Sequence, residues 1–430
     1  MLKEKFKSLV DSKIAIIGLG YVGFPLAIEF AKNRSVIGFD TKESRINEIN
    51  ELVDKNNQIS SEEIKLAEHL VCTSSIEKLA EAKIFIVTVP TPLLEKNKPD
   101  LSYLISATKS IGRLLKKGDI VIYESTVYPG VTSDICTPVL EKESELVHNK
   151  DFFTGYSPER INPGDKSNTI THIKKVTSGS TPEAAEFIDT LYQEIISAGT
   201  HKAPSIEVAE AAKVIENTQR DVNIALMNEL SKIFNKMGLD TGDVLQAANT
   251  KWNFLDFTPG LVGGHCIGID PYYLVHKAEE LNCDSKMIIS GRETNDGMSE
   301  YVSDQILTSM KNKGLKIQNS KVLILGLTFK EDIPDIRNTK VVNIFNRLSK
   351  EGCLVDVYDT NAHQEQVKKS LEINLIKEIE KDTYDVIVLA VPHKKIKDMG
   401  LAFLKSLGKE NHLFFDLKMV FNKEDSDFRL

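Results

Sequence analysis

The sequence predicts an α/β protein with two Rossmann-like, doubly wound parallel-sheet domains joined by a long central helix. Short β-branched runs, each followed by a turn, occur near both ends of the chain. Between them, residues 206–237 form a helical pattern without proline or glycine. We expect domains at 1–205, 206–300 and 315–430. A helix of about 30 residues spans roughly 45 Å, so we expect it to link two domains and to pack against a second subunit in a homodimer or higher homo-oligomer.

Composition limits the classes of function. The 430 residues carry a net charge of −8, which argues against non-specific nucleic-acid or membrane binding. The five cysteines include no Cys-x-x-Cys pair, and the nine histidines show no metal-ligand spacing. No apolar run approaches the ~18 residues of a membrane span, and the charged N-terminus lacks a signal-like apolar segment. We expect a cytoplasmic protein with no metal.

A glycine-rich turn follows the first predicted strand, residues 13–17, and precedes a helical stretch, 24–32. Its spacing, Gly-x-Gly-x-x-Gly, lets the backbone approach a pyrophosphate that faces the helix N-terminus. We expect a dinucleotide to contact Gly18, Gly20, Tyr21, Val22 and Gly23. The alternative is a tight turn that binds nothing.

Asp40 ends the second predicted strand, 22 residues after Gly18. An acid at this distance accepts from the ribose hydroxyls and repels a 2′-phosphate, so the pattern favours NAD over NADP. Arg45 lies close enough to weaken that preference, and we count it as a cofactor contact. The alternative for Arg45 is an ordinary exposed helix arginine.

Thr91 and Thr126 follow two further apolar strands, 84–89 and 120–123. Ligands of doubly wound sheets lie at the carboxyl ends of strands, so both hydroxyls are candidate contacts to the nicotinamide ribose or amide. The alternative is that each caps the next helix.

Two prolines and a glycine predict a rigid loop at 156–164, which carries Glu159 and Arg160. Glu159 is a candidate general base, and Arg160 a candidate ligand for an anion or hydroxyl. On the predicted long helix, Lys213 and Asn217 lie four residues apart and share one face with Arg220. They are candidates to hold a water or a developing oxyanion. The alternatives are a solvated charged loop and a solvated stripe.

The loop at 259–271 contains a single cysteine among four glycines, followed by Asp270. Gly263 and Gly264 are placed to present bare amide groups beside the Cys266 sulfur, and such donors stabilise an oxyanion. A thiolate is a strong nucleophile once its pKa is lowered. The alternative is a buried cysteine that serves as a small apolar residue.

The C-terminal part echoes the first domain but lacks the glycine fingerprint. Its first strand is followed by an insertion, 329–337, which carries Lys330 and Arg337. Two cations in such a loop predict that it binds a phosphorylated group. The alternative is a charged surface loop.

These motifs, in this order, resemble the nucleotide-sugar 6-dehydrogenase family of UDP-glucose and GDP-mannose dehydrogenases over roughly residues 12–420. The resemblance implies that Cys266 is the nucleophile and that Lys213, Asn217 and Asp270 position water or stabilise oxyanions. It also implies that Glu159 assists thioester hydrolysis. By the same transfer Lys330 contacts substrate and Arg337 reaches the cofactor pyrophosphate. The substrate site also includes Glu159, Arg160, Lys213 and Gly263.

Within the family, the two loops at 157–164 and 259–273 resemble the N-acetylhexosamine branch. UDP-glucose dehydrogenases carry Phe-Leu after the glutamate and usually Lys-Asp after the cysteine, whereas this chain has Arg160-Ile161 and Ile269-Asp270. The resemblance therefore implies a UDP-sugar substrate, UDP-N-acetylglucosamine or UDP-N-acetylgalactosamine. It also implies NAD as the cofactor and a product used in capsule, O-antigen or related polysaccharide synthesis. UDP-glucose and UDP-N-acetylmannosamine are the alternative substrates.

Two other functions stay open. A two-electron β-hydroxyacid-type dehydrogenase shares the Rossmann-plus-long-helix layout but needs no cysteine. A non-catalytic nucleotide-sugar sensor would bind ligands without reducing a cofactor, and has no use for a nucleophile.

Overall fold

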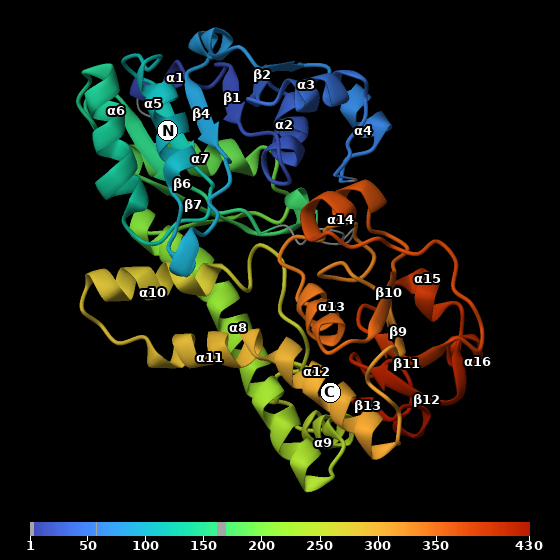
Figure 1. The fold of residues 1–430 in the computed structure, drawn as a ribbon. Helices are drawn as coiled ribbons and strands as arrows, with labels where there is room; N and C mark the ends of the chain where they lie inside the picture. Colours follow the sequence, from blue (N-terminus) through green and yellow to red (C-terminus); the bar gives the residue numbers. More distant parts are fainter. Residues whose placement is uncertain (1–3, 57, 161–168) are drawn as a thin grey trace. The chain divides into compact units, whose positions relative to one another are not determined.

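The computed structural model describes residues 4–56, 58–160 and 169–430 (Figure 1). Contacts divide the chain into two compact units. The N-terminal unit contains Met1–Glu216 and Tyr272–Cys283, and the C-terminal unit contains Asn217–Pro271 and Asp284–Leu430.

The N-terminal unit is built on an eight-stranded sheet with the order β3-β2-β1-β4-β5-β6-β7-β8. The first six strands follow the Rossmann order and run parallel. The pairing of β6 with β7 is antiparallel, so the last two strands run the other way. The strands are β1 Ile14–Ile17, β2 Val36–Phe39, β3 Leu70–Thr73, β4 Ile84–Val87, β5 Ile120–Tyr123, β6 Phe153–Tyr156, β7 Lys175–Gly179 and β8 Thr200–Lys202.

The central strands β1, β2, β4 and β5 are buried along their whole length, because helices cover a parallel sheet on both faces and such strands need apolar side chains throughout. Local signals start several helices: Thr181 caps α7, with Pro182 next to it, and Ser60 with Glu63 forms a capping box on α4. The helices are α1 Glu4–Lys7, α2 Gly23–Ala31, α3 Glu43–Asn50, α4 Ser61–Leu66, α5 Ser102–Gly112, α6 Thr137–Ser144 and α7 Pro182–Gln193, with a π-helix at Val131–Cys136 and short 3₁₀ turns at Ile76–Glu81, Glu95–Asn97 and Ile170–His172.

The long helix α8 spans Ile206–Met237 and lies between the two sheets in the sequence. These are the predicted bounds, because no helix breaker occurs before Gly238, whose φ is +71°. Figure 1 shows it in yellow-green as the longest helix drawn. The helices that follow are α9 Thr241–Ala248, α10 Asp270–Glu280, α11 Lys286–Asp296 and α12 Met298–Asn312.

The C-terminal unit contains a five-stranded, fully parallel sheet with the order β10-β9-β11-β12-β13. This is the 2-1-3-4-5 arrangement, the other common doubly wound order. The prediction of two parallel-sheet units and a long helix is therefore confirmed. The strands are β9 Lys321–Leu325, β10 Leu354–Tyr358, β11 Tyr384–Leu389, β12 Gly408–Asp416 and β13 Phe428–Arg429, and the helices α13 Val341–Lys350, α14 Gln364–Leu371, α15 Lys394–Lys397 and α16 Leu401–Ser406, with a 3₁₀ turn at Lys423–Asp425.

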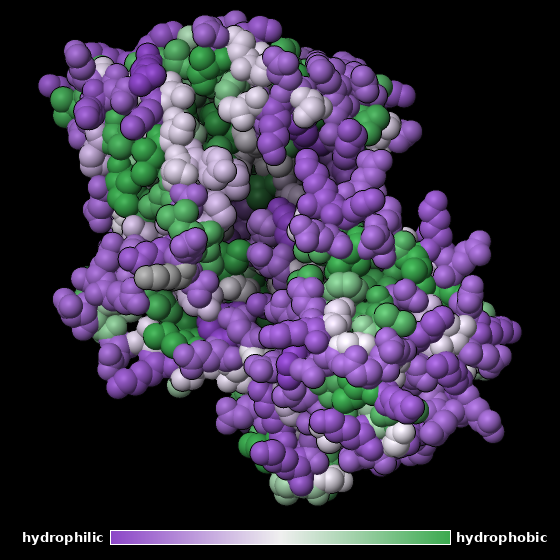
Figure 2. All heavy atoms as spheres, in the orientation of Figure 1, coloured by the Kyte–Doolittle hydropathy of each residue, from purple (hydrophilic) through white to green (hydrophobic). Residues whose placement is uncertain are grey.

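The face drawn in Figure 2 is mostly hydrophilic, with hydrophobic residues gathered in a few groups between hydrophilic ones. Within the part of the chain that the structure describes, no helix is long and apolar enough to cross a bilayer.

Candidate active site

The glycine-rich turn after β1 has the geometry that its spacing predicts. Gly18 has a φ of +98°, a conformation that favours glycine. A Cβ on Gly20 would meet no atom within 4 Å, so the space beside its backbone is open to a ligand. A Cβ on Gly23 would lie 1.9 Å from the Gly18 carbonyl oxygen, so the third glycine lets the helix pack closely.

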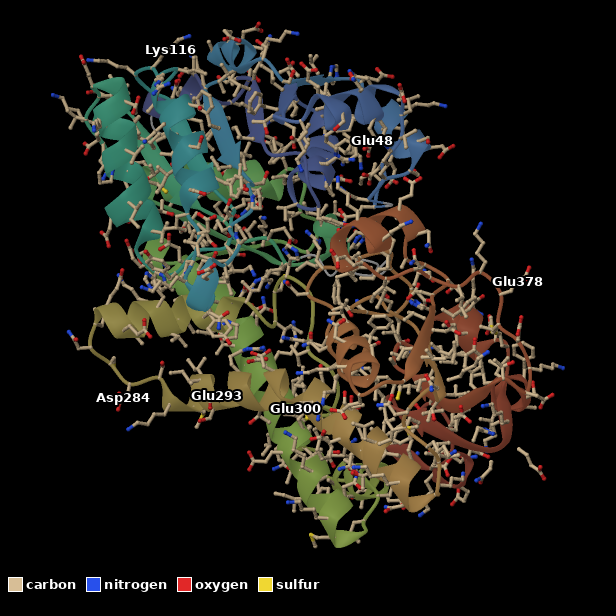
Figure 3. All side chains as sticks on the ribbon, viewed as in Figure 1. Glu48, Lys116, Asp284, Glu293, Glu300 and Glu378 are labelled. Carbon is tan, nitrogen blue, oxygen red and sulfur yellow. The ribbon has the colours of Figure 1, made fainter. Side chains whose placement is uncertain are left out.

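Asp40 and Arg45 both contact this turn. Asp40 accepts from the Leu19 amide at 3.0 Å. The Arg45 guanidinium donates to the Leu19 carbonyl at 2.8 Å and forms ion pairs with Glu48, labelled in Figure 3, and with Asp54. Only 10% of the Arg45 side chain is exposed, so the alternative of an ordinary surface arginine is wrong. Arg45 thus fixes the backbone of the glycine-rich turn at Leu19.

Thr91 and Thr126 lie on neighbouring loops that are bonded to each other. The Thr91 hydroxyl donates to the Thr126 carbonyl at 2.7 Å, and the Tyr273 hydroxyl donates to the Thr91 carbonyl at 2.6 Å. The helical segments that follow each threonine have no side-chain cap. The capping alternative is therefore wrong for both residues, which remain candidate cofactor contacts at the strand ends.

Glu159 lies in a setting that favours its neutral form. Burial raises the pKa of its carboxyl to about 7, although the charges of Lys175 and Lys213 act in the opposite direction. The alternative of a solvated carboxylate is wrong. Residues 161–164 of the predicted loop lie outside the described residues.

A buried polar cluster next to Glu159 escaped the sequence analysis. The Glu124 carboxylate accepts from the Lys175 ammonium at 2.7 Å and from the Tyr192 hydroxyl, and Glu124 is 2% exposed. Its negative charge also contributes to the raised pKa of Glu159. No local pattern marks it, because Glu124 and Lys175 are single charged residues, 51 positions apart, at the ends of two strands.

Arg160 is committed to the long helix. Its guanidinium donates to the carbonyls of Ala212, at 2.6 Å, and Lys213, at 3.0 Å, and pairs with Glu216 at 2.9 Å. Its side chain is 11% exposed, so this residue too is not part of a solvated loop. The contacts fix the Glu159 loop against α8.

A second acid on α8 holds a loop in the same unit. Glu210 is fully buried, and its carboxylate accepts from the amides of Gly130 and Thr132 at 2.6 and 2.9 Å. Burial raises its pKa to about 7, opposed by those hydrogen bonds. The segment it holds begins at Gly130, four residues after Thr126. This role left no signal in the sequence, because a buried acid in a helix cannot be told from a solvated one by its residue type.

Lys213 and Asn217 lie one turn apart on α8, and both are buried, at 5% and 6% exposed. Asn217 donates to the Asp270 carboxylate at 2.6 Å and accepts from Arg220 at 3.2 Å. The solvated-stripe alternative is wrong for the first two residues and right for Arg220, which is exposed. The structure thus joins two predicted site residues, Asn217 and Asp270, by a hydrogen bond that the sequence did not predict.

Cys266 is exposed in a turn directly before α10. Its carbonyl accepts from the amides of Ile269 and Asp270, where the helix begins. The unpaired amide groups and the dipole of a helix N-terminus favour negative charge nearby, and a thiolate is the nucleophilic form of cysteine. The alternative of a buried cysteine is wrong here but right elsewhere: burial raises the thiol pKa at three other positions, to about 12 at Cys72 and Cys136 and about 11 at Cys353.

The cysteine turn packs against the predicted insertion at 329–337. A Cβ on Gly263 would lie 2.8 Å from the Asn338 carbonyl, and one on Gly264 would lie 2.7 Å from the Phe329 ring. Asn338 also donates to the Gly264 carbonyl at 3.1 Å. The two glycines thus allow close approach of the loop that carries Lys330.

Two cations near the cysteine turn, Arg337 and Lys418, are candidates for ligand binding. Arg337 pairs with the buried Asp335 at 2.5 Å, while 38% of its own side chain is exposed. Lys418 was missed by the sequence analysis: its ammonium would be 2.9 Å from a Cβ on Gly260. Lys418 itself is exposed, so its charge can reach a ligand beside this turn.

The second sheet has no open dinucleotide turn. Asp359, which corresponds to Asp40, accepts from the Leu327 amide at 2.5 Å and contacts the buried His393 at 3.0 Å. Although burial favours its protonated form, the hydrogen bond and charge of His393 lower its pKa to about 2. Asp359 therefore stabilises loops within the C-terminal unit, whereas Asp40 is expected to bind a cofactor.

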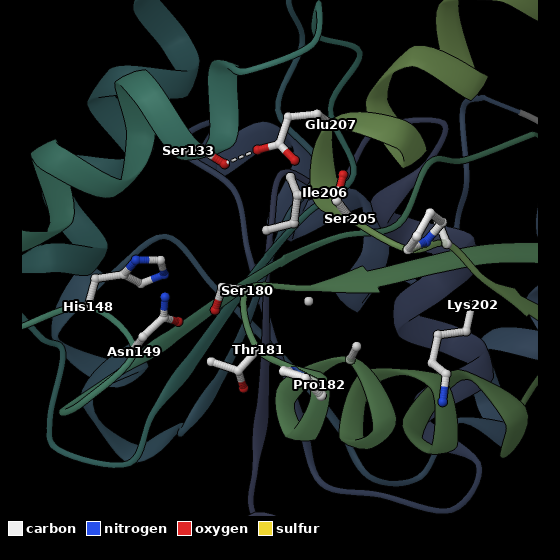
Figure 4. A pocket seen from close by; sticks show the side chains of 14 residues that line it. Ser133, His148, Asn149, Ser180, Thr181, Pro182, Lys202, Ser205, Ile206 and Glu207 are labelled. Atoms are coloured by element: carbon white, nitrogen blue, oxygen red, sulfur yellow. Dashed lines mark hydrogen bonds between the residues drawn. The ribbon is translucent and has the colours of Figure 1, made fainter.

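Figure 4 shows a cavity of about 500 Å³ in the N-terminal unit, where the start of α7 meets residues such as His148, Lys202 and Glu207. None of the predicted site residues lines it. Among the described residues, no cluster of three or more His, Cys, Asp or Glu side chains is arranged to hold a metal ion.

Comparison with known proteins agrees with this arrangement. Models of the UDP-glucose/GDP-mannose dehydrogenase family match its NAD binding domain at residues 12–196, its central domain at 207–297 and its UDP binding domain at 323–423.

Individual relatives match over nearly their full length. The chain is 54% identical to UDP-N-acetyl-D-glucosamine 6-dehydrogenase of Pseudomonas aeruginosa, covering 98% of this chain and 100% of the relative. It is 49% identical to Protein CapL of Staphylococcus aureus, covering 97% and 98%. The solved UDP-D-ManNAc dehydrogenase of Pyrococcus horikoshii is similar with a TM-score of 0.87 at 28% identity, over 96% of both chains. The chain therefore belongs to the UDP-glucose/GDP-mannose dehydrogenase family.

Proposed function

We propose that the protein oxidises the C6 hydroxyl of a UDP-N-acetylhexosamine to the carboxylate, with Cys266 as the covalent nucleophile. The observation that carries the proposal is an exposed cysteine at a helix N-terminus, four residues from an acid that is bonded to Asn217. The close relatives named as UDP-N-acetyl-D-glucosamine 6-dehydrogenases favour UDP-N-acetylglucosamine as the substrate. The epimer UDP-N-acetylgalactosamine differs only at C4.

The residues fit the chemistry of a four-electron oxidation. When bound, NAD accepts one hydride in each of two successive oxidations. After the first, the Cys266 sulfur adds to C6 of the aldehyde, whose oxygen takes a proton to give a thiohemiacetal. Loss of the second hydride from C6, together with the proton of the thiohemiacetal hydroxyl, gives a thioester. Water then adds to C6, the thiol leaves with a proton, and the carboxylate is released.

The buried polar residues are assigned to the charges that develop in these steps. Lys213 and Asn217 stabilise the oxyanion of the tetrahedral species, because such donors act most strongly where water is excluded. Asp270 holds the Asn217 amide at 2.6 Å and sets its orientation. Glu159, with a pKa of about 7, takes the proton from the hydrolytic water.

The substrate and cofactor contacts follow the same assignment. We assign the UDP-sugar to the part of the C-terminal unit that carries Lys330, with Gly263 and Lys418 as further contacts, and Arg337 to the cofactor pyrophosphate. Arg160 positions the Glu159 loop through its bonds to α8. We keep the division into a cofactor domain at 1–205, a central region at 206–300 and a UDP-sugar domain at 315–430.

The N-terminal turn provides a paired test of cofactor binding. Gly20→Ala should leave the melting temperature within about 2 °C, because its Cβ meets nothing within 4 Å, yet weaken NAD binding about tenfold by filling the space for the pyrophosphate. Gly23→Ala should lower the melting temperature by about 5 °C or more through overpacking. Calorimetry measures both, and equal effects of the two variants on folding would contradict the assignment.

The proposed function is tested by incubating the protein with NAD and a panel of nucleotide sugars, and counting NADH and carboxylate per sugar. Two NADH with UDP-N-acetylglucosamine or its galacto epimer support the proposal and select the sugar. One NADH and an aldehyde or ketone would indicate a two-electron dehydrogenase. Binding without turnover of any sugar would indicate a sensor.

We also propose a homo-oligomer formed through α8. Large apolar side chains on α8 are exposed at spacings that place them within one narrow stripe along the helix. They are Val208, Ile215, Leu226, Ile233 and Met237, each at least 44% exposed. A second copy with the same stripe is the partner that this surface fits, and the molar mass from light scattering tests it.

The cellular setting completes the proposal. None of the five cysteines is in a disulfide, and the mechanism requires a reduced thiol, so we assign the enzyme to the cytoplasm. Its product would serve the synthesis of a surface polysaccharide such as capsule or O-antigen. Nucleic acids and membranes are not among the proposed partners.

A further inference from the structure

The loop that carries Cys266, residues 259–271, is held near its start by one side chain. Gly260 donates its amide to Asn228 Oδ1 at 2.8 Å, and Asn228 Nδ2 donates to the Gly260 carbonyl at 3.1 Å. Asn228 is on α8 and is fully buried. Its amide therefore satisfies both polar groups of Gly260, as a neighbouring strand would.

The orientation of this amide is fixed by further groups in the same unit. Asn228 Nδ2 also donates to Asn295 Oδ1 at 2.7 Å. Asn295 Nδ2 donates to the Asp221 carbonyl at 2.9 Å and to its carboxylate at 2.7 Å. Because both groups of Asp221 only accept, Asn295 must turn its oxygen toward Asn228, and Asn228 must turn its own oxygen toward the Gly260 amide.

A buried ion pair anchors this chain of bonds. Arg292, 2% exposed, donates to the Asp221 carboxylate at 2.6 Å. The same guanidinium lies against the other side of the loop, since a Cβ on Gly268 would be 3.8 Å from both of its terminal nitrogens. The cluster thus bonds to the loop at Gly260, six residues before Cys266, and lies near it at Gly268, two residues after Cys266.

The cluster contributes little to the free energy of unfolding, so stability alone does not account for it. Burying an ion pair often costs as much as it gains, and apolar residues of similar size would serve at least as well. The second carboxylate oxygen of Asp221 has no hydrogen-bond partner among the described residues, and burial raises the pKa of this group. What the cluster supplies is a defined position for the loop backbone.

We infer that Asn228 is a positioning residue for the Cys266 nucleophile: through its two bonds to Gly260 it sets where the thiol lies relative to the start of α10. The inference rests on the proposed function, in which Cys266 reacts with the substrate. A displacement of about 1 Å in a reacting group costs on the order of 10²-fold in rate. Without the clamp the sulfur also loses its fixed relation to the helix N-terminus, which favours the thiolate.

The test compares Asn228→Ala with Asn223→Ala, a control on the same helix whose amide donates only to the Gln219 carbonyl at 2.8 Å. For Asn228→Ala we expect kcat with the nucleotide sugar to fall about 10²-fold while the Kd for NAD changes less than about twofold. Alkylation of Cys266 by iodoacetamide at pH 7, followed by peptide mass spectrometry, should slow at least about threefold. Cys283, which is also exposed, is the internal reference and should react at an unchanged rate. Asn223→Ala should match the wild type throughout.

Asn228→Asp is the second variant, because it keeps the shape and the acceptor for the Gly260 amide but loses both donors. Its new oxygen faces the Gly260 carbonyl and Asn295 Oδ1, so it should show the same changes in the same direction and gives a second readout if the alanine variant does not fold. Unchanged Cys266 alkylation in a folded variant overturns the inference, as does an equal change at Cys283. The alkylation readout needs no turnover: slowed Cys266 alkylation in a protein that oxidises no sugar upholds the positioning role and refutes the proposed function.

Discussion

Cys266→Ser is expected to lower carboxylate formation by on the order of 10⁴-fold, because a serine hydroxyl without an activating base does not form the covalent adduct. NADH released per sugar should fall from two to at most one, since the first oxidation does not involve the thiol. Parallel counting of NADH and of carboxylate by mass spectrometry measures both.

The matched control is Cys283→Ser, which replaces the other exposed cysteine of the chain. Its kcat should stay within about twofold of the wild type, as for an ordinary surface substitution. A Cys266→Ser enzyme that still releases two NADH and a carboxylate at a similar rate would remove the thioester from the mechanism.

Glu159→Gln is expected to slow thioester hydrolysis by about 10²–10⁴-fold, the usual contribution of a general base. The acyl-enzyme should accumulate on Cys266 and be visible by intact-mass spectrometry after a single turnover. The first oxidation should be far less affected, because it precedes the hydrolytic water.

The pH dependence gives the same assignment an independent check. Only the carboxylate form of Glu159 acts as a base, and its raised pKa of about 7 means that this form disappears as pH falls through 7. Hydrolysis in the wild type should therefore be constant above that pH and fall tenfold per unit below it. Glu159→Gln should lose this dependence, whereas Glu216→Gln, which removes only the exposed partner of Arg160, should keep it. A wild-type profile that is flat between about pH 5.5 and 8.5 would exclude Glu159 as the base.

Features set by local sequence were predictable. The bounds of α8 follow from an uninterrupted helical pattern that stops at Gly238, and the glycine turn follows from spacing between a strand and a helix. The exposed apolar stripe on α8 shows what such patterns cannot predict. A helical period identifies the apolar positions, but it does not say which part of the protein or of a partner covers them. The antiparallel step from β6 to β7 also left no local signal.

Roles set by distant partners were not predictable. Asn228, Asp221 and Glu210 are polar residues in a helix, and the sequence gives the same residue types on its solvated face. Their burial depends on groups 32 to 80 positions away in the chain: Gly260 for Asn228, and Gly130 for Glu210. By contrast, Asn217 and Asp270 were identified as site residues because the resemblance carries both of them, although the bond between them was not predicted.

An acid ends the second strand of both sheets, but the surroundings of the two acids differ. Substitution should therefore change ligand binding in the first sheet and folding in the second. Asp40 is half-buried beside open space, so exchanging it alters what the protein accepts from outside, and this position is open to redesign toward a phosphorylated cofactor. The Asp359 carboxylate is fully buried and bonded to the Leu327 amide and to His393, so it is not available to bind a ligand. Exchanging it would strand a buried imidazole and loop amides, so it would damage folding without offering a new specificity.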